Sequence, residues 1–270
     1  MNNFFQNKYS IGVVTYIKRF DTYFVPLVKQ LEKVFPKVEK NYILNGYYDE
    51  GLQKEYLQKA TEFLKTIKAN AVVTHLSHQP LARCWNQLIL VSKAEKVLIL
   101  NDDLEIYWPF KWFFNAQVGL FDSATVNRSW SHFFISKSTV KKIGWFDERL
   151  AGNGMEDGDY AMRMALYYKQ TEMPHSHLHN IYCLGVKNII AGNPDPGWKG
   201  NFKLANNRFA KENEDFFNKK WQPQKSALPG SVHFMQVYCK LNQEFGTPVY
   251  YPFSELNTAQ DSGKISTFKF

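Results

Sequence analysis

Apolar and amphipathic segments alternate over the first hundred residues. Four short apolar runs, rich in β-branched residues, predict strands at residues 11–16, 42–44, 71–75 and 97–100. Between them, apolar positions that recur every three or four residues predict helices at 21–34, 52–68 and 81–93. This order indicates an α/β fold with a mostly parallel central sheet flanked by helices, whose ligands sit beyond the carboxyl ends of the strands.

The pattern is less regular after residue 103. We expect helices at 108–120, 139–143, 156–168 and 204–220, a strand pair at 124–128 and 130–136, and a loop marked by Gly152, Gly154 and Gly158. A stretch rich in glycine and proline, 191–200, precedes the last helix, and from residue 222 the chain is aromatic and irregular. We therefore expect one domain over residues 1–221 and a C-terminal extension, 222–270, that packs on the core or forms an oligomer contact.

Composition limits the choice of partners and compartment. The 270 residues carry 33 basic and 25 acidic side chains, a net charge of +8, which favours anionic partners such as nucleotides, phosphates or anionic lipids. Three widely spaced cysteines without a CxxC pair indicate reduced thiols. The N-terminus lacks the order of a signal peptide and no apolar run reaches membrane-spanning length. We expect a cytoplasmic protein, with peripheral contact to the inner face of a membrane left open.

The first chemical motif is the acid pair Asp102-Asp103, which follows Asn101 at the end of a continuously apolar strand. Two adjacent carboxylates repel each other, so something must offset them, and a divalent cation that bridges to a phosphate does this well. Mg²⁺ and Mn²⁺ prefer oxygen ligands and keep positions for a substrate phosphate. An acidic turn is the alternative interpretation, since such dipeptides are common in turns.

The second motif surrounds the glycine-marked loop. Asp147 and Glu148 precede it, and Glu156, Asp157 and Asp159 open the following helix. A helix N-terminus favours acids, so capping explains one of them. The remaining acids exceed that need, and a carboxylate here could serve as general base for a sugar hydroxyl. We expect the helix dipole to keep such a base ionised.

Other common motifs are missing from the sequence. It has no GxxxxGK[ST] or GxGxxG after the first strand, and no GxSxG or HExxH. These absences argue against a P-loop, a dinucleotide-binding domain, an α/β-hydrolase and a zincin.

The two acidic motifs, with a strand pair between them, resemble the GT-A glycosyltransferases, in particular the inverting family 2. The resemblance covers about residues 9–221 and implies a Rossmann-like nucleotide-sugar-binding fold. The matching pieces are VVTY at 13–16, Leu44-Asn45-Gly46 with Asp49, Arg83-Cys84-Trp85-Asn86, LILNDD at 98–103, Gly144-Trp145-Phe146-Asp147-Glu148, Glu156-Asp157-Gly158-Asp159 with Arg163, and FFNKKW at 216–221.

The resemblance implies a role for each matching residue. On the donor side, Thr15 and Tyr16 would flank the base, Asn45 and Asp49 would lie near base and ribose, Asn101 and Asp102 would lie at ribose and phosphates, and Asp103 would bind Mn²⁺ or Mg²⁺. On the acceptor side, Asp157 would be the catalytic base, Glu156 would order the loop or meet the acceptor, and Trp145 would stack near the acceptor sugar. Arg83 would contact the diphosphate or pair with an acid, and we favour pairing.

Two further features bear on this reading. In related transferases a histidine after the catalytic helix often completes the metal site, and of His175, His177 and His179 we select His179. The aromatic segment 108–114 is expected to be core, since such segments more often are; a membrane-facing surface is the alternative.

The expected activity is inverting transfer of a sugar from a nucleotide-sugar donor, UDP-sugar favoured, to a hydroxyl of a glycan or lipid-linked glycan, as in polysaccharide biosynthesis. A nucleotidyltransferase of nucleotide-sugar synthesis is one alternative, although residues 15–19 lack the glycine-rich loop it would need. A non-catalytic glycan-binding module is the other. A nucleic-acid partner is not expected, because no pattern other than the charge supports one.

Overall fold

The computed structural model describes residues 8–47, 49–67, 69–152, 154–170, 179–189, 209–222, 244 and 265–268. Within these residues, eight strands form one sheet and two short strands pair beside it. The strands are β1 (Tyr9–Thr15), β2 (Lys40–Leu44), β3 (Ala71–His75), β4 (Lys96–Asn101), β5 (Leu104–Ile106), β6 (Ser123–Val126), β7 (Ser129–Ser136), β8 (Asn180–Ile181), β9 (Val186–Asn188) and β10 (Ile265–Phe268).

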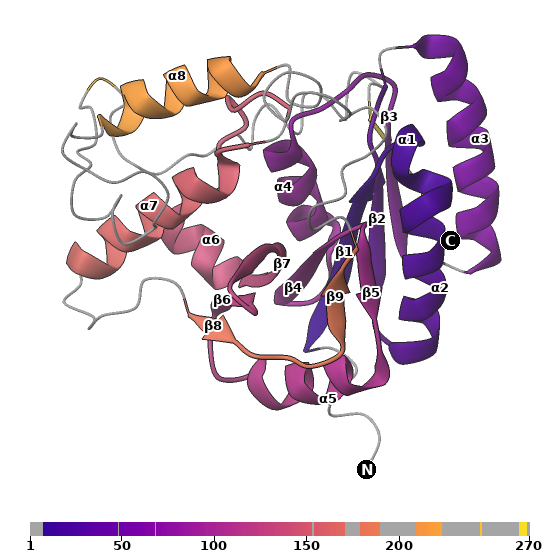
Figure 1. Cartoon of the computed structure of the whole chain (residues 1–270), viewed down its shortest axis with the longest axis horizontal. Coiled ribbons are helices and arrows are strands. Elements are labelled where there is room, and N and C mark those ends of the chain that lie inside the picture. Colours follow the sequence, from indigo (N-terminus) through magenta and orange to yellow (C-terminus); the bar gives the residue numbers. More distant parts are fainter. Residues whose placement is uncertain are drawn as a thin grey trace.

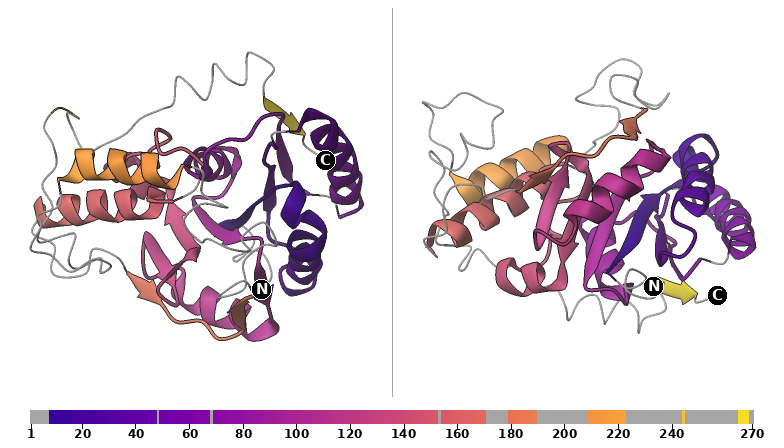
Figure 2. Two further views of the ribbon diagram at one scale, coloured as in Figure 1. Left: turned by 45° about the horizontal axis from the view of Figure 1, so that its top comes forward. Right: turned by 90° about the horizontal axis from the view of Figure 1, so that it is seen from below.

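The helices lie on both faces of the large sheet (Figures 1 and 2). They are α1 (Ile17–Arg19), a π-helical turn at Phe20–Phe24, α2 (Val25–Val34), α3 (Glu50–Thr66), α4 (Leu81–Val91), α5 (Trp108–Gln117), α6 (Lys137–Ile143), α7 (Glu156–Gln170) and α8 (Ala210–Trp221).

The order of strands in the large sheet is β10-β3-β2-β1-β4-β7-β6-β8. The four strands β3, β2, β1 and β4 run parallel, and β10 and β7 flank them in the antiparallel direction. Because β1 lies between β2 and β4, the strand order reverses at β1. In open α/β sheets ligands bind at such a reversal, outside the carboxyl ends of the strands. The loops that follow β1 and β4 are therefore the place to look for a site.

Alternating side chains of the sheet build two apolar layers. On one face, Val13, Leu98 and Leu100 pack with helices α2, α3 and α5, and on the other, Ile43, Val97 and Ile99 pack with α4, α6 and α7. A parallel strand covered on both faces should be continuously apolar. The run of residues 97–100, each at most 1% exposed, satisfies this.

The predicted α/β order is confirmed, and the first four strands lie where the apolar runs predicted them. The segment predicted as one helix from residue 21 divides into α1, the π-helical turn and α2. Gly158 lies inside α7, so its assignment to the loop was wrong. Of the helix predicted at 204–220, the described part is α8, and residues 191–200 lie outside the described residues.

Glycine is required where the chain leaves β2. A Cβ atom on Gly46 would lie 2.0 Å from the backbone carbonyl carbon of Ser77, closer than real Cβ atoms approach. The loops after β2 and β3 therefore touch backbone to backbone at this edge of the sheet. The side chain of Asn45 joins the same two loops, because its amide donates to the Gln79 carbonyl and its oxygen accepts from the Gln79 N–H.

Candidate active site

The loops after β1 and β4 bring an arginine onto the acid pair. Arg19, at the end of α1, places Nε 2.6 Å from Asp102 Oδ1 and Nη2 3.1 Å from Asp103 Oδ1. The Thr15 hydroxyl donates to Asp102 Oδ2 at 2.7 Å. A cation that offsets the two adjacent carboxylates is therefore supplied by the chain itself. The expected roles of Thr15 and Asp102 toward a nucleotide remain predictions.

Electrostatics at the acid pair are dominated by burial. The pKa of Asp102 is raised to about 6. Burial is the main cause, the charge of Asp103 acts in the same direction, and Arg19 acts in the opposite direction. For Arg19, burial alone would lower the pKa, but the two carboxylates outweigh it and hold the pKa above its ordinary value. Arg19 therefore remains a cation in contact with both carboxylates.

His132 is a buried residue at this end of the sheet that the sequence did not single out. It lies on β7 directly opposite Leu100 of β4, so it comes close to the acid pair. Among the described residues, neither ring nitrogen has a hydrogen-bond partner. Burial lowers the pKa of His132 to about 4, while the charge of Asp103 acts in the opposite direction. A neutral imidazole without hydrogen bonds in the described structure is able to bind a metal ion. The position of His132 at this site follows from the β4–β7 register and could not be read from the sequence.

The five acids around the glycine-marked loop separate by their partners. Asp147 contacts Lys220 and Arg149, and Asp159 contacts Arg163, Lys220 and the Trp221 indole N–H. Glu148 accepts from Arg83 at 2.7 Å and from the Asn86 amide at 2.8 Å. These three acids therefore serve the structure, and the expected pairing of Arg83 with an acid is confirmed.

Glu156 and Asp157 differ from the other three acids. Their hydrogen bonds in the described part of the chain come from backbone N–H groups, Gly154 to Glu156 and Gly158 to Asp157. Burial raises the pKa of both, and the charge of Asp157 raises that of Glu156 further, to about 8. At Asp157 burial acts against the backbone N–H groups, which lower the pKa, and the expectation that the helix dipole keeps Asp157 ionised remains a prediction.

Burial determines which carboxyl group of the pair Glu156 and Asp157 keeps a proton. Two adjacent carboxylates in a buried setting do not both ionise readily, so one keeps a proton. Glu156 is the more buried of the two, at 6% exposure, while Asp157 is half-buried. The proton therefore belongs on Glu156, which leaves Asp157 as the ionised carboxylate with raised basicity.

The N-terminus of α7 lies at the same end of the sheet as the acid pair. The Leu81 N–H, at the start of α4 just beyond β3, donates to the Gly152 carbonyl at 2.6 Å. The Tyr160 ring lies 6.5 Å from the ring of Trp130, near the start of β7 and therefore near His132. These contacts place Asp157 and Asp103 at the same end of the sheet, although the elements that carry them are far apart in the sequence.

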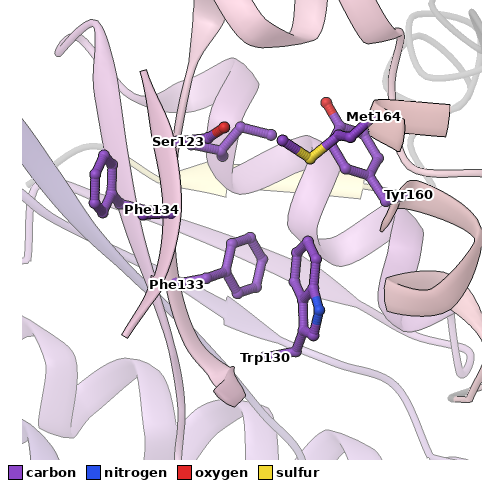
Figure 3. Close-up of a pocket in the computed structure, with 8 residues that line it drawn as sticks. Ser123, Trp130, Phe133, Phe134, Tyr160 and Met164 are labelled. Carbon is purple, nitrogen blue, oxygen red and sulfur yellow. The ribbon is translucent and has the colours of Figure 1, made fainter. Parts of the chain in front are cut away.

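A small apolar cavity shows how α7 is seated. Its volume is about 10 Å³, and Trp130 and Phe133 of β7 point across it toward Tyr160 and Met164 of α7 (Figure 3). The Tyr160 hydroxyl also donates to the Gly144 carbonyl at 3.0 Å. Close packing of this kind fixes the position of a helix. The aromatic contacts therefore set where the first turn of α7, with Asp157, meets the sheet.

The remaining donor-side residues lie on the loops beyond β1, β2 and β4. Tyr16 precedes α1, and Asn101 ends β4 half-buried, next to Val14 in the register. Asp49 is exposed and caps α3, since its carboxylate accepts from the Leu52 N–H at 3.0 Å. Their expected roles toward a nucleotide remain predictions.

The structure does not bring His179 to Asp103. His179 precedes β8 at the outer edge of the sheet, where β6 and β7 separate it from β4, and its ring stacks on Phe121 with centroids 4.4 Å apart. A returning segment does reach Asp103, but through β9, since the Ile189 N–H donates to the Asp103 carbonyl. His175 and His177 lie outside the described residues.

Trp145 lines a pocket of about 220 Å³ between α4 and α6. Its neighbours there include Ile89, Leu90 and Val140, with Lys137 and Lys141 at the border. Ile89 and Leu90 belong to the end of α4, while the loop before α7 contacts its beginning. The expected stacking of Trp145 on an acceptor sugar remains a prediction.

The chain is similar to several solved structures. TarS from S. aureus is 15% identical, with 58% of this chain and 54% of that one covered at a TM-score of 0.44. A mannosyltransferase from Pyrobaculum calidifontis, in complex with GDP-Man and Mn²⁺, is 14% identical over 67% of this chain and 57% of that one, with a TM-score of 0.45. Glucosyl-3-phosphoglycerate synthase from Mycobacterium tuberculosis, in complex with Mn²⁺, UDP and glucosyl-3-phosphoglycerate, is 11% identical over 71% of this chain and 82% of that one, with a TM-score of 0.46.

This chain spans about half the length of the TarS structure that it matches. No protein-family model and no curated protein matches the sequence.

The residues around the acid pair fit a divalent cation whose ligands come partly from the protein and partly from a phosphate. Asp103 Oδ1 is buried and, in the part of the chain that the structure describes, has no hydrogen bond, although it lies in ion-pair contact with Arg19. Within the described ranges, no three His, Cys, Asp or Glu side chains form a complete metal-binding group. Mg²⁺ and Mn²⁺ are commonly held by one or two carboxylates together with substrate phosphates, so a complete protein cage is not needed.

Proposed function

We propose that the protein is an inverting, divalent-cation-dependent glycosyltransferase that moves a sugar from a nucleotide-sugar donor to a hydroxyl group. The observation that carries this proposal is the division of the acids at one end of the sheet. Asp102 and Asp103 are arranged around a cation, whereas Glu156 and Asp157 are buried at a helix start with backbone partners only in the described structure. One pair suits a diphosphate with its metal, and the other suits proton transfer.

On the donor side, Asp103 would hold Mn²⁺ or Mg²⁺, with His132 close by. The cation supplies neutralisation of the charge that develops on the leaving diphosphate. Thr15 holds Asp102 through its hydroxyl, which keeps the carboxylate oriented at the end of β4. Thr15 and Tyr16 would flank the base, and Asn45 and Asp49 would lie near base and ribose. Asn101, at the end of β4, would lie with Asp102 at ribose and phosphates.

On the acceptor side, Asp157 accepts the proton of the attacking hydroxyl. Its burial strengthens its basicity, and the Gly158 N–H holds one oxygen at 2.8 Å, which orients the carboxylate. Glu156 keeps its own proton and binds the Gly154 N–H, so it orders the loop. Because the hydroxyl attacks the anomeric carbon directly from the face opposite the leaving group, no enzyme nucleophile is needed.

UDP-sugar is the favoured donor, and a glycan or lipid-linked glycan the favoured acceptor. A nucleotidyltransferase would need a nucleoside triphosphate and would release pyrophosphate, whereas a glycan-binding module would be indifferent to nucleotide and metal. Measuring the products and the nucleotide requirement therefore separates the three.

The test is calorimetric titration of UDP and GDP with and without Mn²⁺. We expect Mn²⁺ to strengthen binding of one nucleotide by about tenfold or more, since the cation joins the carboxylate to the phosphates. Asp103→Asn, which keeps the size of the side chain, should abolish that increase while Tm stays close to wild type. Asp157→Asn is the matched control, since it should bind the nucleotide normally. Equal affinity with and without Mn²⁺ in the wild type would refute the metal-dependent part of the proposal.

We also propose a peripheral membrane contact through an aromatic face on α5 and the segment between β8 and β9. Here the apolar residues that stand out to solvent, defined as the aromatic face, are Tyr107, Trp108, Trp112, Phe113, Tyr182 and Leu184. The segments adjoin, because the Tyr107 N–H donates to the Gly185 carbonyl and the Gln117 amide to the Tyr182 carbonyl.

Cations border this aromatic face. Lys111 lies over the Trp108 ring at 5.5 Å and Arg128 over the Tyr182 ring at 6.0 Å. Tryptophan, tyrosine and basic side chains together favour the interface of an anionic bilayer. The expectation that the whole 108–114 segment is core was wrong, because only Phe110 and Phe114 of α5 are buried. No helix in the described part of the chain is long and apolar enough to cross a membrane.

A further inference from the structure

Arg19 occupies the place between the two carboxylates where a metal would have to sit. Its guanidinium contacts both acids, and the group is largely covered, with side-chain exposures of 15% for Arg19, 5% for Asp102 and 7% for Asp103. On its other side, the guanidinium lies over the Tyr23 ring at 5.2 Å. The site is therefore closed by a cation of its own chain.

A divalent cation and this guanidinium cannot share the acid pair in its present arrangement. Both carry positive charge, and Arg19 already contacts Asp102 Oδ1 and Asp103 Oδ1. At contact distances and low solvent exposure, repulsion between the two cations would be strong. Binding of a metal at Asp103 therefore requires Arg19 to leave.

The backbone limits where Arg19 can go. Phe20 and Phe24, on either side of the π-helical turn, are buried, and the Arg19 N–H donates to the Tyr16 carbonyl at 2.9 Å. The side chain must therefore move by rotation while its Cα stays beyond the end of β1. That position is where an α/β sheet of this strand order binds phosphate-bearing ligands. A guanidinium matches phosphate oxygens with two parallel hydrogen bonds.

We propose that Arg19 is a resident counter-ion of the metal site, which exchanges the acid pair for the donor's diphosphate when the metal binds. The proposal rests on the function proposed above. Before donor binding, Arg19 neutralises Asp102 and Asp103. When metal and nucleotide bind together, Asp103 would hold the metal and Arg19 would turn to the phosphates. Arg19 thus resists the metal alone and assists the nucleotide that accompanies it.

This exchange predicts changes of opposite sign in one variant. Arg19→Gln removes the positive charge and keeps hydrogen-bonding ability. Titrated with Mn²⁺ alone, it should bind the metal at least about tenfold more tightly than wild type, because the competing cation is gone. Titrated with UDP at saturating Mn²⁺, or GDP if that is the nucleotide bound, it should bind at least about tenfold more weakly, because the phosphates lose a charged partner.

Lys18→Gln is the matched control, since it removes one charge from the adjacent residue and should change neither affinity. Arg19→Lys keeps the charge without the planar fork, so its metal affinity should stay near wild type; it also serves if Arg19→Gln unfolds, since weaker nucleotide binding is again expected. Tm for every variant shows whether the fold persists.

The outcomes separate this proposal from the proposed function. If wild type binds Mn²⁺ and nucleotide and Arg19→Gln fails to show both opposite changes, the exchange is refuted and the glycosyltransferase proposal stands. If neither wild type nor Arg19→Gln binds Mn²⁺ or nucleotide, both proposals fail.

Discussion

Asp157 and Asp159 lie two residues apart on the first turn of α7, yet their surroundings give them different chemistry. Asp159 is held by Arg163, Lys220 and Trp221, so its contacts are with structural partners. Asp157 has a backbone partner and a raised pKa. An acid that is buried without a compensating cation costs stability, and such positions are typical of functional sites.

Replacing Asp157 tests its role as base. Asp157→Asn keeps size and hydrogen bonding but removes basicity, so turnover should fall by about 10²–10⁴-fold. Affinity for the nucleotide should hardly change, because the base acts on the acceptor. The measurements are steady-state turnover with the acceptor and calorimetry with the nucleotide.

Glu156→Gln is the companion variant, because it keeps the donor that a protonated Glu156 already presents. We expect turnover within about tenfold of wild type, a smaller loss than removal of the base would give. A Glu156→Gln enzyme that is inactive beside an active Asp157→Asn enzyme would reverse the two assignments. If both variants kept full activity, the direct-displacement mechanism would be wrong.

Glu156 also predicts a pH dependence of stability. Its pKa is raised from 4.5 to about 8 in the folded protein, so between these values the folded state holds a proton that the unfolded state has released. The stability associated with this proton is complete below pH 4.5 and is lost as the pH rises toward 8. Glu156→Gln should therefore lose less stability than wild type between pH 5 and pH 8.

Thermal unfolding at both pH values measures this difference. For each kcal/mol of unfolding free energy that Glu156→Gln keeps and wild type loses, the Tm of wild type should fall by about 2–4 °C more than that of the variant. Glu55→Gln, at an exposed position on α3, is the control and should follow the wild type. A Glu156→Gln protein with the pH profile of wild type would contradict the assignment of the proton to Glu156.

Among single residues, the sequence predicted acids better than their partners. Asp102, Asp103 and Asp157 are visible because acids gathered at strand and helix ends are unusual. Arg19 and His132 are invisible, because a lone basic residue near a strand carries no pattern. Arg19 lies 83 positions from Asp102, and His132 faces Leu100 only through strand pairing. Such contacts follow from topology, which local spacing does not specify.

Among elements, strong periodicity predicted the structure well and pairing over long distances did not. The strand at 71–75 and the start of α4 at Leu81 match the sequence-based expectation. The missed strands β5 and β9 have three residues each and pair across some eighty positions. Runs that short have no measurable period, and their strand conformation depends on the partner.

A buried ionic network joins three elements behind the candidate base. Lys220 of α8 contacts Asp147 at 2.9 Å and also Asp159 of α7, and all three side chains are at most 2% exposed. Lys220→Met would leave both acids without this cation. We expect a loss of about 3–5 kcal/mol in the free energy of unfolding, as for other broken buried pairs.

Chemical denaturation measures the loss. Lys219→Met, on the exposed side of the same helix, is the control and should cost little. A Lys220→Met protein as stable as wild type would show that α8 is not held through this network. Nucleotide affinity should be retained in the Lys220 variant at low temperature, since the acid pair lies elsewhere.

At the scale of the whole molecule, the aromatic face and the candidate site lie at opposite ends of the sheet. α5 packs at the amino ends of β1 and β4, where the Tyr9 hydroxyl donates to Asn115 and Lys96 donates to the Val118 carbonyl. The acid pair directly follows the carboxyl end of β4. Docking through α5 would therefore leave the site accessible.

Vesicle binding tests this face. The double variant Trp108→Ser, Trp112→Ser should bind vesicles containing phosphatidylglycerol about tenfold more weakly or worse, because two exposed indoles no longer enter the interface. Leu52→Ser, Leu76→Ser removes exposed apolar side chains elsewhere and is the control. Nucleotide affinity should be the same in both.

Equal sedimentation of wild type with anionic and with neutral vesicles would contradict an anionic partner. Loss of a dimer on a sizing column in the tryptophan variant, without any vesicle binding by wild type, would show instead that a second copy covers the face.

The antiparallel strand β10 limits association between copies of the molecule. Ile265–Phe268 pairs with β3, whose five residues are all buried and include the apolar run Ala71–Val73. Without β10, β3 would be the outermost strand, and its free N–H and C=O groups would offer a template to any other extended chain. Pairing of these four residues with β3 therefore protects the sheet from aggregation. A protein that lacks them should precipitate on storage even though its candidate site is intact.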